Sequence, residues 1–127
     1  MVSYILTGRS AAARAHLAGM TGNESVCISA ITEGELRYGV EKSGNDRQRN
    51  ALHGFLQRMP IQPWDSSVAM EYGRLRAKQE KAGKTIGPLD MQIAAHAIAL
   101  GATLVTRDKG FEQIDDLPGM VNWATDL

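Results

Sequence analysis

Three acidic residues, far apart in the chain, are of the type that binds a hard divalent cation: Glu35, Asp90 and Asp108. Carboxylate oxygens are the ligands that Mg²⁺ and Mn²⁺ prefer. A bound ion of this kind lowers the pKa of a water molecule and clamps a phosphate for in-line attack. Each acid lies at the edge of an expected strand or helix in an alternating α/β pattern, which is where open α/β sheets hold their active sites. The three acids therefore predict one metal site that acts on phosphate esters.

Asp90 is the strongest of these candidates. It falls in the first turn of a helix that we expect to begin at Pro88, where an acid also complements the helix dipole. The same face of this helix carries Ile93, Ala94 and Ala97, which should pack on a sheet. Because an acid on a packed face is costly unless it is paired or binds a cation, the position of Asp90 favours a functional role.

Glu35 and Asp108 each have a structural interpretation as well. Glu35 follows Thr32 by three residues, which is the spacing of a capping box at the start of a helix. Asp108 stands in an ordinary turn sequence after a strand. Thr106 adds a hydroxyl beside Asp108, at the carboxyl edge of that strand. The alternative acid near Glu35, Glu33, points a different way around the helix.

The elements that would position these residues follow an alternating order. Strands are expected at 2–6, 26–29, 61–64, 103–106 and 120–123. Helices are expected over 11–17, 32–40, 46–59, 65–83 and 88–100, with caps or stops at Ser10, Asn45 or Asp46, Pro60, Gly83 and Gly101. Strands separated by helical crossovers predict a parallel sheet of four to five strands with helices on both faces. We therefore expect one three-layer α/β/α domain spanning residues 1–127.

The overall composition is that of an ordinary globular protein: 127 residues, 43% hydrophobic, 22% charged and a net charge of zero. No apolar run has the length of a membrane span, and no secretory leader is evident, so we expect a cytoplasmic protein that does not contact a membrane. The single Cys27 excludes an internal disulfide, and its apolar surroundings predict a buried structural thiol. Neutral total charge argues against a protein that coats nucleic acid.

Five bases gather between residues 74 and 84, and they have two interpretations. They contact RNA phosphates, or they form a solvated helix face. These bases are Arg74, Arg76, Lys78, Lys81 and Lys84. His16, His53 and His96 lack the spacing of a zinc pair, and we expect Trp64 and Trp123 to contribute to the core rather than to base stacking.

Four segments together resemble one known family. They cover residues 2–6, 27–39, 86–94 and 104–108, and the segments around Glu35 and Asp90 are specific in combination. The chain resembles the PIN-domain ribonucleases of the VapC type, which are toxins of bacterial type II toxin–antitoxin pairs. The resemblance implies a three-layer PIN-like fold and a Mg²⁺- or Mn²⁺-dependent endoribonuclease that acts on transfer RNA. It also implies a homodimer and a VapB-like antitoxin that forms a hetero-oligomer with the toxin. By this resemblance Glu35, Asp90 and Asp108 are metal ligands and catalytic residues, and Thr106 supports them.

The chain departs from that family at the end of the first strand. The family has Asp-Thr-Asn there, followed by a short apolar helix, and the Asp is a central metal ligand. Here Leu6 runs directly into Thr7 and Gly8. Because Thr7 carries no negative charge, we expect impaired or absent turnover. The alternative function is a non-catalytic module that binds antitoxin, and a DNA-directed nuclease would use the same acids.

Overall fold

The computed structural model describes residues 2–8 and 24–123. Within them, five strands form one sheet in which all pairings are parallel. The strands, in sheet order, are β3 (Ile61–Gln62), β2 (Glu24–Ser29), β1 (Val2–Leu6), β4 (Thr103–Val105) and β5 (Met120–Val121). The expected parallel sheet is thus confirmed, although β3, β4 and β5 are shorter than the sequence suggested. The expected helix over 11–17 and its cap at Ser10 lie outside the described residues.

β1 lies in the middle of the sheet, where the direction of the winding changes. From β1 the chain continues to β2 and β3 on one side, and later to β4 and β5 on the other. β1 and β4 are paired neighbours, with Leu6 opposite Val105. Because the strand order reverses between β1 and β4, their carboxyl ends are where an open α/β sheet of this kind forms its binding crevice.

The helices follow the capping signals of the sequence with one exception. They are α2 (Ala30–Ser43), α3 (Asp46–Arg58), α4 (Ser66–Lys81) and α5 (Pro88–Leu100), with a 3₁₀ helix η1 (Lys109–Gln113) after β4. Asn45 caps α3 by accepting a hydrogen bond from the Gln48 amide, and Asp65 caps α4. Pro88 occupies the first turn of α5, and Gly101 ends it in the left-handed region at φ 64°.

The exception is the start of α2. This helix begins at Ala30, and its N-cap is Ser29, whose hydroxyl accepts from the Ile31 amide at 3.0 Å. Thr32 therefore lies inside the helix, and the expectation that it forms a capping box with Glu35 is wrong. A cap residue needs an extended backbone, and the end of β2 provides it at Ser29, with φ −75° and ψ 149°.

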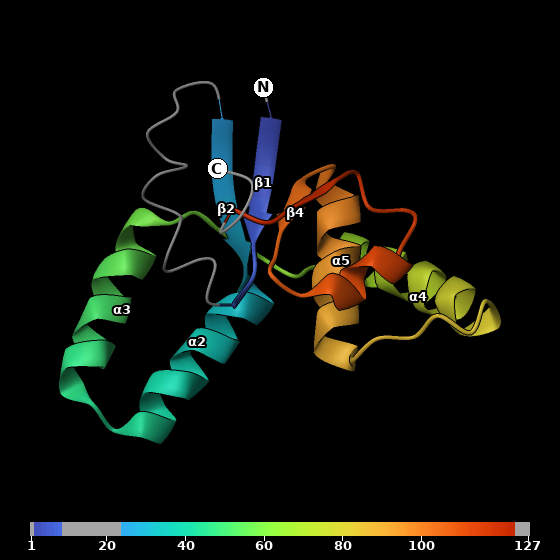
Figure 1. Ribbon diagram of the computed structural model, residues 1–127. Helices are drawn as coiled ribbons and strands as arrows, with labels where there is room; N and C mark the ends of the chain where they lie inside the picture. Colours follow the sequence, from blue (N-terminus) through green and yellow to red (C-terminus); the bar gives the residue numbers. More distant parts are fainter. Residues whose placement is uncertain (1, 9–23, 124–127) are drawn as a thin grey trace.

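Two hydrophobic clusters pack on opposite faces of the sheet. Ile5 belongs to the cluster formed with α4, α5 and η1, whereas its neighbour Leu6 belongs to the cluster formed with α3. This alternation follows from the period of two in a β-strand. The arrangement gives three layers, with α4 and α5 beside one another and α2 and α3 forming a separate hairpin (Figure 1).

The two tryptophans contribute to packing, as expected. Trp123 is buried and lies edge-on to Tyr4, with 5.1 Å between the ring centroids. Trp64 donates from Nε1 to the Gln92 carbonyl at 3.1 Å. Burial raises the pKa of the Cys27 thiol to about 11, which keeps it protonated at neutral pH and agrees with a structural role. No helix in the described part of the chain combines the length and the apolar character that a membrane crossing requires.

Candidate functional site

An open cavity of about 530 Å³ lies at the carboxyl ends of β1 and β4. It collects residues from five parts of the chain: the end of β1, the first two turns of α2, the start of α5, the end of β4, and η1. The residues that line it are Thr7, Gly8, Thr32, Glu35, Leu89, Asp90, Ile93, Thr106, Arg107, Asp108 and Phe111. Glu35, Asp90, Asp108 and Thr106, the four residues singled out in the sequence, therefore share one cavity.

Asp90 is the most enclosed acid of the three. It stands in the first turn of α5 and is half-buried, while Glu35 and Asp108 are exposed. Partial burial raises the pKa of the Asp90 carboxyl group, and the negative charges of Asp108 and Glu35 raise it further. The three carboxylates thus repel one another across the cavity, and a cation between them would relieve that repulsion.

Asp108 both stabilises the turn after β4 and lines the cavity. Its Oδ1 accepts a hydrogen bond from the Gly110 amide at 2.8 Å, which caps η1. Its own amide donates to Thr106 Oγ1 at 3.0 Å. A Cβ at position 110 would lie 3.1 Å from Asp108 Oδ1, so glycine there leaves the carboxylate in place. One carboxylate oxygen is thus committed to the turn, and Oδ2 is left for a ligand.

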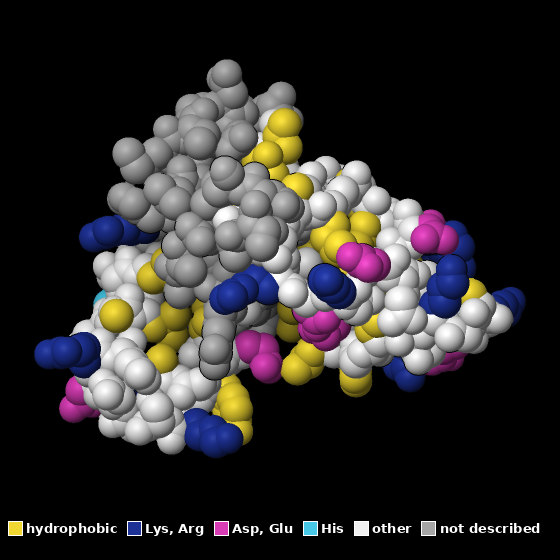
Figure 2. Space-filling view, viewed as in Figure 1, with side chains coloured by type: hydrophobic (Ala, Val, Ile, Leu, Met, Phe, Trp, Pro, Cys, Tyr) yellow, Lys and Arg dark blue, Asp and Glu magenta, His cyan; other side chains and the backbone are white. Residues whose placement is uncertain are grey.

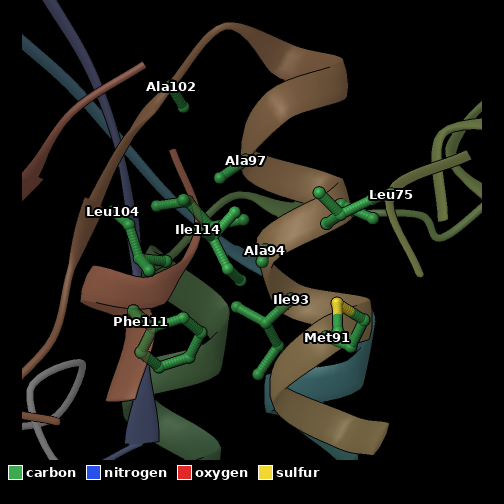
Figure 3. Packing of buried hydrophobic residues seen from close by; sticks show 11 residues of the cluster. Leu75, Met91, Ile93, Ala94, Ala97, Ala102, Leu104, Phe111 and Ile114 are labelled. Carbon is green, nitrogen blue, oxygen red and sulfur yellow. The ribbon is translucent and has the colours of Figure 1, made fainter. Parts of the chain in front are cut away.

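Apolar packing fixes Asp90 relative to Asp108. Ile93 lies one turn after Asp90, and Phe111 lies three residues after Asp108. Both side chains are buried in the same cluster, and both line the cavity. Figure 3 shows Ile93 and Phe111 pointing toward one another between α5 and η1. Because interiors are close-packed, this contact holds the two acid-bearing segments at a set separation.

A buried polar contact joins the two helices that carry Glu35 and Asp90. His96 on α5 lies with its Nδ1 2.8 Å from the hydroxyl of Ser29, the residue that caps α2. Both residues are buried. Burial lowers the pKa of His96, and Asp65 partly opposes this effect. His96 is therefore a structural residue, and its contact with Ser29 fixes the position of α2 relative to α5.

Thr7 occupies the position directly after β1. It is buried, and its Oγ1 donates to the Val105 carbonyl at 2.8 Å across the β1–β4 pair. A hydroxyl that donates there still has lone pairs facing elsewhere, but it adds no negative charge to the cavity. The cavity therefore holds three acids, and the end of β1 contributes none.

The oxygen atoms that line the cavity are of the chemical type that binds a divalent cation, but they are not arranged around one point. Three carboxylates and three threonine hydroxyls line the cavity, and all are hard oxygen donors. Nevertheless, among residues 2–8 and 24–123, no group of three or more His, Cys, Asp or Glu is arranged to hold one metal ion. The acids share the cavity without closing around a common point. Direct coordination by all three therefore does not fit this arrangement.

Two residues that line the cavity were missed in the sequence. Arg107 is exposed and is the one basic residue of the cavity lining. Thr32 is 1% exposed, and its Oγ1 is the only buried side-chain polar atom in the described residues without a hydrogen-bond partner. The sequence did contain a signal for Arg107, namely its position between Thr106 and Asp108, two residues already expected at the site. Thr32 had none, because its burial depends on tertiary packing.

None of the five bases between 74 and 84 lines the cavity. Arg74 and Lys78 both contact Asp116, and Arg74 also pairs with Glu71. The remaining ion pairs of this segment are Arg76–Glu80 at 2.9 Å and Lys84–Asp115 at 3.9 Å. Lys and Arg side chains are scattered over the face shown in Figure 2 rather than gathered in one patch. Glu33, in turn, pairs with Arg37 at 2.8 Å and is absent from the cavity lining.

Comparison with known proteins identifies the family. The PIN domain family model matches residues 1–117. Ribonuclease VapC2 of Rickettsia felis is 42% identical over 103 residues, which cover 80% of this chain and 76% of that protein. The chain belongs to the VapC-type PIN-domain ribonucleases. A second VapC relative, the tRNA(fMet)-specific endonuclease VapC of Shigella flexneri, is 36% identical over 94 residues, covering 72% of this chain and 71% of that one.

Solved structures of the VapC type share this fold. VapBC2 from Rickettsia felis, bound to a DNA fragment from its promoter, matches with a TM-score of 0.84 and 34% identity over 95% of this chain and 98% of that one. DNA-bound VapBC from Salmonella typhimurium also matches with a TM-score of 0.84, at 30% identity over 97% and 99% of the two chains. The three-layer PIN-like fold expected from the sequence is confirmed. The nucleases of this family generally use a divalent metal ion.

Proposed function

We propose that this chain is the toxin of a type II toxin–antitoxin pair and that its parent reaction is hydrolysis of RNA phosphodiester bonds by a Mg²⁺- or Mn²⁺-dependent endoribonuclease. The observation that carries the proposal is the convergence of Glu35, Asp90 and Asp108 on one cavity at the carboxyl ends of β1 and β4. Three segments, distant in sequence, deliver oxygen donors to the crevice where open α/β sheets bind their ligands. The VapC ribonucleases among its relatives supply the reaction class.

The roles of the cavity residues follow from their chemistry. Glu35, Asp90 and Asp108 would attract a divalent cation to the cavity, and the cation would supply a water of lowered pKa and positive charge opposite the phosphate. Thr106 holds the Asp108 backbone in position through its hydroxyl. Ile93 and Phe111 exclude water from one wall of the cavity.

We propose transfer RNA as the substrate, since a relative is named as a tRNA(fMet)-specific endonuclease. Arg107 is placed to contact a phosphate at the rim of the cavity, because a guanidinium binds phosphate oxygens in pairs. Arg74, Arg76, Lys78, Lys81 and Lys84 stay candidates for a second RNA contact. Four of them already have acidic partners, which lowers the charge that they offer to RNA.

A VapB-like antitoxin is the proposed protein partner. The similar solved structures are VapBC assemblies, in which toxin and antitoxin are combined. We propose that this chain likewise forms a homodimer and a hetero-oligomer with its antitoxin. We also propose a cytoplasmic location, because that is where its RNA substrate and its partner occur.

Turnover by this chain is proposed to be weak or absent. Thr7 stands at the end of β1 as an uncharged residue, and its hydroxyl is engaged by the Val105 carbonyl. This observation favours a second candidate function, a non-catalytic module that binds antitoxin without cutting RNA. The two functions share the fold and the partner and differ in the reaction alone.

The two functions are separated by incubating the purified protein, at high concentration, with transfer RNA in the presence of Mn²⁺ or of EDTA. The endoribonuclease predicts slow cleavage that EDTA stops and that Asp90→Asn abolishes. Complete absence of cleavage, together with binding of the cognate antitoxin, makes the binding module the function. Cleavage that persists in EDTA or in the Asp90→Asn protein contradicts the proposed metal site.

A further inference from the structure

A second pocket, termed the β5 pocket, lies beside the cavity at the carboxyl ends of β4 and β5 and has a volume of about 280 Å³. Thr106, Arg107 and Asp108 line both hollows, which therefore share one wall. The other walls come from η1 and from β5, the last of the described strands on this side of the sheet. A linear polymer that lies across the cavity can thus continue directly into the β5 pocket.

Arg107 and Lys109 give the β5 pocket two basic side chains. Both are exposed, and within residues 2–8 and 24–123 neither forms an ion pair. By contrast, four of the five bases between 74 and 84 are paired with acids. Since a base without an acidic partner offers its whole charge to a phosphate, the β5 pocket suits RNA better than α4 does.

The two bases differ in position. Arg107 lies in the shared wall, whereas Lys109 lines the β5 pocket and not the cavity. A phosphate held by Lys109 would therefore be the neighbour of a phosphate held by Arg107 at the rim of the cavity. The volume of the pocket lies just below the range of roughly 300–1,000 Å³ that is usual for small-molecule sites, so it suits one nucleoside rather than a longer stretch.

Three further lining residues suit a nucleobase. Met120 and Val121 are half-buried and give the pocket apolar surface, and Glu112 on η1 is exposed beside them. A carboxylate repels phosphate, but it accepts hydrogen bonds from the N–H groups on the edge of a base. Guanine presents two such groups side by side, N1–H and the amino group, whereas uracil presents only N3–H. Glu112 therefore favours guanine over uracil.

We propose that the β5 pocket binds the nucleotide next to the scissile phosphate of the RNA, with Lys109 on its outer phosphate and Glu112 on the edge of its base. This inference rests on the proposed function and names a nucleotide subsite of that enzyme. The occupant is an unpaired nucleotide, because pairing would hide the base edge that Glu112 contacts. Guanosine is the favoured occupant.

The test titrates the full chain with guanosine 3′,5′-bisphosphate and, separately, with uridine 3′,5′-bisphosphate in metal-free buffer, followed by ¹H–¹⁵N spectra. We expect both to shift the amide signals of residues 107, 109, 112 and 121, and the guanosine compound to bind roughly fivefold more tightly. Shifts confined to α4 would overturn the inference. Equal affinity for inorganic phosphate would make the pocket an anion site only and would overturn it as well.

Two substitutions test the side chains, both of which are exposed. Lys109→Ala should lower affinity for guanosine 3′,5′-bisphosphate up to about fivefold and reduce the salt dependence. Lys81→Ala is the matched control, because Lys81 is an exposed base outside the pocket. Glu112→Ala should remove the preference for guanosine over uridine. Unchanged affinity of the Lys109→Ala protein would remove Lys109 from the site, and a preference that survives in Glu112→Ala would overturn the contact with the base.

Binding of a labelled single-stranded RNA of eight nucleotides separates this inference from the proposed function. Fluorescence anisotropy in metal-free buffer compares the unchanged chain with Lys109→Ala. If the RNA binds both proteins equally well, the β5 pocket is not part of the RNA site and only this inference fails. If the unchanged chain binds neither the RNA nor the bisphosphates, the ribonuclease fails too, and the antitoxin-binding module is left as the function.

Discussion

Asp90 on α5 lines the same cavity as Asp108, and partial burial together with the negative charge of Asp108 raises the pKa of the Asp90 carboxyl group. Glu35 adds to the effect from α2. The acid-bearing segments are held at this separation by the packing of Ile93 against Phe111 (Figure 3). The fold thus keeps mutually repelling charges in one cavity, which is unfavourable without a cation and typical of functional sites.

Asp90→Asn should therefore stabilise the protein without metal. The pKa of Asp90 is higher in the folded than in the unfolded chain, so the folded state binds more protons between these two pKa values. Stability is consequently lost as pH rises through this window. We expect the melting temperature of Asp90→Asn to exceed that of the unchanged chain by a few degrees at most at pH 7, and the difference to shrink on acidification.

Thermal unfolding in EDTA at pH 7 and at pH 4.5 measures this effect. Glu112→Gln is the control, since Glu112 is exposed on η1 and does not line the cavity. A lower melting temperature for Asp90→Asn at pH 7 would show that the carboxylate has a stabilising partner within the protein.

His96 should make the fold sensitive to mild acid. Its pKa is lowered chiefly by burial, so the unfolded chain binds a proton that the folded chain excludes. The stability associated with neutral His96 is present above the unfolded pKa of about 6.5 and is lost as pH falls toward the lower folded pKa. We expect the free energy of unfolding to decrease between pH 7.5 and pH 5.

Urea unfolding of three proteins checks this expectation. His96→Asn should flatten the pH dependence and cost about 1–3 kcal/mol at pH 7.5, because Ser29 loses its buried partner. His53→Asn should keep the pH dependence of the unchanged chain, because His53 is exposed on α3. An equal pH dependence in all three proteins would show that other groups cause the acid sensitivity.

Thr7→Asp should strengthen cation binding at the expense of stability. The new carboxylate adds a fourth negative charge to the cavity, and we expect Mn²⁺ affinity to rise at least roughly tenfold. The substitution also removes the hydrogen bond from Thr7 Oγ1 to the Val105 carbonyl, which should cost about 1 kcal/mol.

Calorimetric titration with Mn²⁺ measures the affinity. Thr7→Asn serves as the control, because asparagine has the shape of aspartate but carries no charge. We also expect Thr7→Asp to cleave transfer RNA faster than the unchanged chain. Unchanged Mn²⁺ affinity would show that the end of β1 does not contribute to the cation site.

Arg107→Ala should weaken RNA binding more than removal of a basic side chain from α4. Each phosphate that a protein no longer neutralises reduces the slope of log affinity against log salt by about 1. Lys81→Ala is the matched comparison, because Lys81 is also exposed but lies outside the cavity. Both changes are made in the Asp90→Asn chain, so that RNA stays intact while fluorescence anisotropy reports affinity. A larger effect of Lys81→Ala would place the RNA-binding surface on α4 instead.

Most helix boundaries could be predicted from the sequence, because the residues that start or stop a helix act on backbone groups only a few positions away. Pro88 and Gly101 bracket α5 through backbone geometry, and Asn45 and Asp65 cap their helices by bonds to nearby amides. The start of α2 was misjudged because two candidate caps, Ser29 and Thr32, stand close together. β2 ends at Ser29, as expected, and α2 begins at the next residue, so the last residue of the strand is itself the cap and no loop separates the two elements.

The cavity could be foreseen only in part. Glu35 lies in the helix directly after β2, and Asp108 follows β4, so these two carboxylates share a sheet edge by topology and their grouping is predictable. The burial of Thr32, the contact of His96 with Ser29 and the pairing of the α4 bases with Asp116 were not. Each joins residues that are remote in the chain, and only close packing of the sheet with its helices brings them together. The residue types thus limit the chemistry of this site, while the tertiary fold sets the distances on which that chemistry depends.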